Sequence, residues 1–139
     1  MAELVTISSA QGTSVIFGLR APVSGNKTLT ITWTGSAEVF AAAISFANVN
    51  QTSDGAAFPH TASGQNAATV ALASATGHMV VGCQASGSVQ GTQTGTSIYS
   101  DSASGTVING QAEYGPGGAS VAVGSSGINA TIAAFDVSP

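Results

Sequence analysis

Residues 27–35, KTLTITWTG, alternate threonine with large apolar side chains at a strict period of two. In an extended chain, Leu29, Ile31 and Trp33 share one face and the threonines share the other. Threonine is stiff at χ1 and packs well on a pleated surface, so the pattern is typical of a half-buried β-strand. We therefore expect residues 28–34 to form a strand that places Trp33 in the core.

Similar period-two segments recur along the chain. They span residues 14–20, 38–46, 68–74, 79–85, 106–114, 119–123 and 129–135. Stretches such as SDG, GPGG and GSSG separate them and have the composition of turns. The alanines of residues 38–46 also favour a helix, but the large apolar residues there form no continuous stripe of period 3.6.

These patterns predict an all-β fold. We expect a single antiparallel β-sandwich over residues 1–139, jelly-roll-like in topology, with about eight short strands joined by glycine-rich turns. A chain of 139 residues suits one domain and can bury a core without disulfides.

The charge content excludes two classes of partner. Only 6% of the residues are charged, and Arg20 and Lys27 are the only cations in the chain. Phosphate groups are bound by clusters of Lys and Arg, so nucleic acid is not an expected partner, and neither is an anionic membrane. No apolar run approaches the roughly 18 residues of a spanning helix. The N-terminus, MAELVTISSA, has no basic segment followed by an apolar one, so no secretory signal is expected.

The stretch NVNQTSDG, residues 48–55, follows the 38–46 segment and contains polar residues suited either to a turn or to a ligand. As a polar crossover, its Asn and Asp side chains would bond to their own backbone, and Asp-Gly would make a tight turn. As a ligand site, Asn50, Gln51 and Asp54 would contact a sugar or Ca²⁺. Calcium needs six to eight oxygens, so Asp101 would have to approach in space.

No catalytic or metal site can be assembled from the sequence pattern. His60 and His78 have no zinc-ligand spacing and are expected to be a loop histidine and a strand-entry histidine. No G-x-S-x-G motif occurs, and no cofactor is expected. Cys83 lies in an apolar alternating run and is expected to be buried and unreactive. The carboxylates are too scattered to nominate a glycosidase pair; they are Glu3, Glu38, Asp54, Asp101, Glu113 and Asp136.

A strand ending in A-x-S-F and followed by x-x-V-x-Q-T resembles a family of jelly-roll-like β-sandwich modules of bacterial exported proteins and phage virion proteins. The residues that carry the resemblance are Ala43, Ser45, Phe46, Val49, Gln51 and Thr52. Members of that family usually have a proline after the Gln-Thr pair, where this chain has Ser53-Asp54, and they usually begin with an extra pair of strands. The resemblance implies a non-catalytic surface or packing module.

We therefore expect a structural module of an extracellular assembly, most of all a phage virion component such as a decoration, fibre or tail protein. Its partners would be copies of itself or capsid and tail proteins, and its location the virion or cell surface. The alternative is a carbohydrate-binding module of a secreted bacterial protein, with Tyr99 and Tyr114 as the sugar-stacking residues. A hydrolase is a third, weaker hypothesis.

Self-association is expected from the missing upstream strands. Without them, residues 4–7 or 14–20 would lie at an unprotected sheet edge, whose free N–H and C=O groups can accept a strand from another chain. The charge-free surface between Asp54 and Asp101 would supply the rest of a closed cyclic contact, in a dimer or a trimer.

Overall fold

The computed structural model describes the chain except residues 11, 36–37, 89–90, 102–108 and 127–128. The all-β prediction is confirmed, because the described residues form strands and one single-turn helix, α1 (Asp54–Ala57). The strands are β1 (Ala2–Ser9), β2 (Gly12–Gly18), β3 (Thr61–Ala67), β4 (Thr69–Leu72), β5 (Met79–Ser86), β6 (Thr96–Asp101), β7 (Asn109–Pro116), β8 (Val121–Gly124) and β9 (Ala130–Val137). Among these residues, no helix has the length and apolar character needed to cross a bilayer.

The centre of the molecule is a five-stranded antiparallel sheet in the order β3-β9-β5-β7-β6. β9 is buried at every position, because sheet neighbours flank it and other strands cover both of its faces. Its sequence, ATIAAFDV, suits that place, since small alanines lie beside Ile132 on one face and beside Phe135 and Val137 on the other. The C-terminal strand is therefore the core of the fold.

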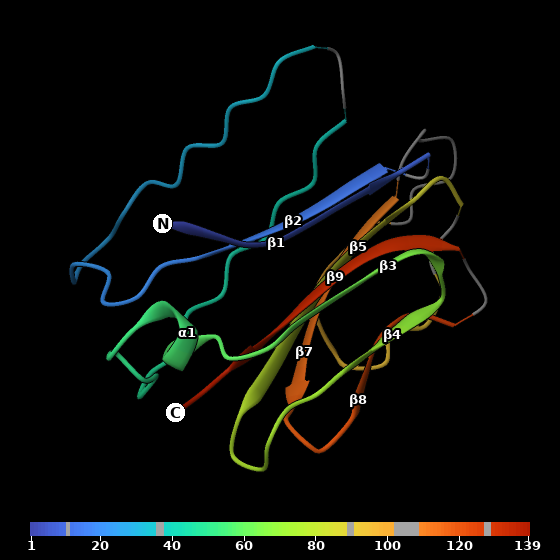
Figure 1. The fold of residues 1–139 in the computed structure, drawn as a ribbon. Helices are drawn as coiled ribbons and strands as arrows, with labels where there is room; N and C mark the ends of the chain where they lie inside the picture. Colours follow the sequence, from blue (N-terminus) through green and yellow to red (C-terminus); the bar gives the residue numbers. More distant parts are fainter. Residues whose placement is uncertain (11, 36–37, 89–90, 102–108, 127–128) are drawn as a thin grey trace.

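Two small antiparallel ribbons pack on opposite faces of this sheet (Figure 1). The β1–β2 ribbon covers the face that presents Val81, Ala133 and Phe135. The β4–β8 ribbon covers the other face, where Val123 packs against Ile132 and its neighbours. The strands are thus layered face to face; the jelly-roll connectivity stays a prediction.

Most of the expected strands are present. The segments 14–20, 68–74, 79–85, 119–123 and 129–135 overlap β2, β4, β5, β8 and β9. The segment 106–114 coincides with β7 from residue 109 onward, and its first three residues lie outside the described part. The alternation does not reveal β3 and β6, whose sequences TASGQNA and TSIYSD are mostly polar, because both lie at sheet edges and face solvent.

The strands expected at residues 28–34 and 38–46 do not form, and this corrects the clearest prediction of the sequence. Both segments lie outside any helix or strand. Leu29, Ile31 and Trp33 are 52%, 46% and 54% exposed, so the expectation that Trp33 lies in the core is wrong. A strand needs a hydrogen-bonding neighbour as well as a suitable side-chain pattern, and β1, β2 and the central sheet provide none for these residues.

Both segments belong to a long connection between β2 and α1 that we call the arm (residues 22–35 and 38–47). Figure 1 shows the arm leaving the end of β2, running out from the sheets and returning to α1. We call residues 28–34 the outgoing limb and residues 38–46 the return limb. The return limb is anchored, because the Phe40 ring lies 6.2 Å from the Tyr99 ring and Phe46 packs against the β1–β2 side of the core.

Candidate functional site

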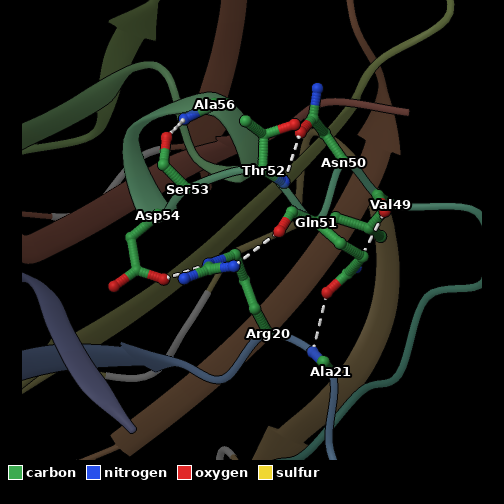
Figure 2. Close-up of polar contacts among 9 residues, drawn as sticks. All are labelled: Arg20, Ala21, Val49, Asn50, Gln51, Thr52, Ser53, Asp54 and Ala56. Atoms are coloured by element: carbon green, nitrogen blue, oxygen red, sulfur yellow. Dashed lines mark hydrogen bonds and ion pairs between the residues drawn. The ribbon is translucent and has the colours of Figure 1, made fainter.

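The polar stretch after the arm contains three of the residues expected to bind a ligand, and Figure 2 shows their contacts. The carboxylate of Asp54 accepts a hydrogen bond from Arg20 Nε at 2.5 Å, and Arg20 Nη1 donates to the backbone oxygen of Gln51 at 2.7 Å. The side-chain oxygen of Gln51 accepts from the backbone N–H of Ala21 at 2.8 Å. Arg20, Gln51 and Asp54 therefore join the start of the arm to its end.

Two further contacts order the same stretch locally. Gln51 Nε2 donates to the backbone oxygen of Val49 at 2.7 Å, and Asn50 Oδ1 accepts from the backbone N–H of Thr52 at 2.9 Å. Ser53 caps α1 by accepting from Ala56 N–H at 3.1 Å. Asn50 bonds to nearby backbone, as expected for a polar crossover, whereas Asp54 bonds to Arg20 and begins α1 with Gly55. We call the contacts of Arg20 and Ala21 with residues 49–54 the clasp; ligand binding by Asn50, Gln51 and Asp54 stays a prediction.

Tyr99 and Tyr114, the other predicted ligand residues, lie on neighbouring strands. Tyr99 of β6 pairs with Ala112 of β7, and Ala112 shares a face with Tyr114 two residues on. Both side chains therefore lie on the same face of the sheet. Neither is fully exposed, since Tyr114 packs against the core and Tyr99 lies beside Phe40.

A polar cluster that sequence reasoning missed lies at the end of β9. The fully buried carboxylate of Asp136 meets His60 Nδ1 at 3.0 Å and His78 Nδ1 at 2.9 Å, both through Oδ2. Its Oδ1 accepts from Ser74 Oγ at 2.7 Å. His60 lies in the loop before β3 and His78 at the entry to β5, as expected, but the sequence pattern did not indicate that one carboxylate binds both. We call these four residues the Asp136 cluster.

The electrostatics of this cluster follow from its contacts. Burial raises the pKa of Asp136, but the hydrogen bonds from His60, Ser74 and His78, with the charge of His78, outweigh it and hold the pKa below its ordinary value. Each imidazole faces an acceptor through Nδ1, so Nδ1 carries the proton and Nε2 is the acceptor of the neutral ring. The sequence does contain one signal, an aspartate inside an otherwise apolar strand, since a buried charge must be paired.

The cluster holds groups used in acid–base chemistry, and its contacts join distant parts of the chain. His60 and His78 have side chains 49% and 18% exposed, so Nε2 of His60 is the more accessible. The Ser74 hydroxyl donates to the carboxylate and is thus not presented to an imidazole as a nucleophile. The backbone N–H of Asp136 also donates to His60 O at 2.9 Å, so the cluster ties β9 to the start of β3 and to the β4–β5 turn.

A second buried carboxylate, Glu113 of β7, has partners of its own. It accepts hydrogen bonds from Gly124 N–H and Gly95 N–H at 2.6 Å each, and from Thr94 Oγ1 at 3.1 Å. These contacts join the sheet to β8 and to the residues before β6. Glu113 lies beside a shallow gap lined by glutamines, glycines and Val123, which leaves no room for a water molecule and is therefore not a ligand pocket.

The single thiol lies between the sheet and β2. Cys83 Sγ is partly buried and approaches the backbone oxygen of Val15 at 3.9 Å. Burial raises the pKa of the thiol to about 12, against smaller lowering contributions from Ser14 and Val15. The neutral thiol is a poor nucleophile, which agrees with the expectation of an unreactive residue.

Within the described ranges, no group of three or more His, Cys, Asp or Glu side chains is placed to hold a metal ion. Comparison with protein-family models, with curated proteins and with solved structures found no match.

Proposed function

We propose that this chain is a non-catalytic structural module that assembles with other protein subunits, as in a virion or another extracellular assembly. The observation that carries the proposal is the arm. Six of its large apolar side chains are exposed; they are Val23, Leu29, Ile31, Trp33, Val39 and Ile44. Monomeric soluble proteins rarely expose contiguous apolar patches larger than a few hundred Å², and larger ones mark interaction sites.

The arm is held in place rather than left as a free tail, which supports an interaction role. The clasp closes its base through Arg20 and Asp54, and Phe40 anchors the return limb on β6. Ordering such a segment before binding lowers the conformational entropy that association must overcome. The outgoing limb contains no charged residue, so its burial leaves no charge to desolvate.

The test is the oligomeric state of the purified chain. We expect sedimentation velocity from low to high micromolar concentration to show a species larger than the 13.4 kDa monomer, with a population that rises with concentration. A single monomeric boundary over the whole range would contradict self-assembly. The proposal would then be limited to an arm that binds a different protein subunit.

A second candidate, a carbohydrate-binding module, has one favourable observation. Tyr99 and Tyr114 lie on one sheet face, and aromatic rings in a row can stack on sugar rings. On this proposal, titration with oligosaccharides should quench tyrosine fluorescence, and Tyr99→Ala should abolish the quenching. Titrations that leave the emission unchanged at millimolar sugar would reject it.

A further inference from the structure

The outgoing limb is symmetric about its central residue. Its sequence, TLTITWT, has threonine at residues 28, 30, 32 and 34, with Leu29 and Trp33 on either side of Ile31. The pattern reads the same way in both directions. A strand with this property can pair with a second copy of itself without any offset between its apolar and threonine faces.

We propose that two copies of this chain pair their outgoing limbs antiparallel about a two-fold axis through Ile31. This rests on the proposed assembly function and names its partner and contact. Ile31 then lies opposite Ile31 of the second copy, and Leu29 opposite Trp33. Aromatic–aliphatic and threonine–threonine pairs are favourable across antiparallel strands. Pairing also supplies the hydrogen-bonding strand that the limb lacks among the described residues of its own chain.

The charge distribution favours a second copy as the partner. The chain has a formal net charge of −4, so surfaces that bring two copies together must avoid its carboxylates. Residues 28–34 carry no charge, and the flanking Lys27 and Glu38 have opposite signs. Antiparallel pairing of the limbs therefore opposes no like charges directly across the axis.

The pairing also brings the exposed apolar side chains of the two limbs together. Leu29, Ile31 and Trp33 are each about half exposed in the single chain. In the pair, each contacts its cross-strand partner on one face of the two-stranded ribbon. A two-fold contact is isologous, so each arm serves as both donor and acceptor surface.

Single cysteines placed along the limb test the register. Residues opposite each other in an antiparallel pair have Cα atoms about 4.5–5.5 Å apart, within the range that a disulfide spans. With Ile31→Cys we expect diamide to produce a covalent dimer. Two copies of Leu29→Cys, or of Trp33→Cys, would hold their thiols about four residues apart along the strands, roughly 13 Å, and should not cross-link. A mixture of Leu29→Cys and Trp33→Cys should form the mixed dimer.

The native Cys83 stays in every variant, and the unchanged chain measures its own contribution to cross-linking. Ile31→Lys places two like charges on the axis and should raise the dimer dissociation constant at least about tenfold, while Thr76→Lys, on an exposed turn, should leave it unchanged. Circular dichroism is the control that checks whether each variant keeps its β-sheet signal.

The outcomes separate this inference from the proposed function. Cross-linking at residue 31 together with the mixed 29–33 dimer supports the two-fold pairing. A parent chain that associates while no limb cysteine cross-links, or while Ile31→Lys associates normally, overturns the pairing and leaves the assembly function standing. A parent chain that remains monomeric at all concentrations overturns both the pairing and self-assembly.

Discussion

Buried carboxylates hold the layers of this protein together. Asp136 is fully buried and receives hydrogen bonds from His60, before β3, and from Ser74 and His78, both in the β4–β5 turn. A buried charge is stabilising only while its partners remain, because desolvation costs several kcal/mol when the charge is left without compensation. The contacts of this single side chain therefore contribute strongly to fixing how the ends of the strands meet.

Replacement of Asp136 tests this role. We expect Asp136→Asn to lower the free energy of unfolding by about 3 kcal/mol, because the amide cannot accept from all three donors and presents donors of its own. Urea denaturation at neutral pH is the measurement. Asp54→Asn is the matched control: its ion pair with Arg20 is exposed, so the loss should be under about 1 kcal/mol. Equal losses in the two variants would show that the cluster has no special weight.

The lowered pKa of Asp136 predicts a loss of stability in acid. Since the folded-state pKa lies below the unfolded value of about 3.9, the unfolded chain binds the proton more readily. The contribution of Asp136 is thus fully present above the unfolded pKa and is lost as the pH falls through the folded pKa. The parent chain should therefore lose stability more steeply than Asp136→Asn as the pH falls below the unfolded pKa of about 3.9. Parallel curves for the two proteins would count against the assignment.

At the scale of elements, the contact between the central sheet and β8 is set by one glycine. A Cβ at Gly82 of β5 would lie 2.1 Å from Val123 Cγ1, closer than packed atoms allow. Its absence lets the β4–β8 ribbon approach the sheet. The alternation in MVVGCQA predicted the strand correctly. It could not predict the close neighbour of Gly82, because Val123 belongs to a strand some forty residues further along the chain.

Gly82→Ala should therefore destabilise the fold by about 1–3 kcal/mol through overpacking. Gly115→Ala in β7 is the control, because a Cβ there meets nothing within 4 Å. The midpoints of thermal unfolding compare the two variants. If both alanines have the same effect, general strand propensity rather than packing against Val123 explains the result.

In the molecule as a whole, the arm has the sequence pattern of β-strands but takes no place in a sheet. The β-strand pattern of residues 28–34 and 38–46 is genuine, but nine other strands occupy the places in the described sheets. The limb pairing proposed above would restore the predicted strand in the dimer. The same sequence signal would then describe the assembled protein rather than the single chain.

The proposed dimerisation through the arm would make thermal stability depend on concentration. A partner that binds the folded chain stabilises it by mass action, so the unfolding midpoint of the parent should rise as its concentration increases. Ile31→Lys should show a midpoint that stays constant across the same range. Differential scanning calorimetry at several concentrations makes the comparison, and a constant midpoint for the parent would argue against an obligate pair.

The sequence by itself determined the all-β class and the strands that overlap β2, β4, β5, β8 and β9, because alternation is a local property that each segment carries alone. It also indicated that residues 48–55 bond locally, since the Asn50 side chain accepts from the backbone of Thr52. Only the tertiary structure decided which patterned segments find a neighbour and which, such as residues 28–34, remain exposed. It alone joined His60, His78 and Asp136, because contacts between distant residues depend on how the whole chain fills its layers.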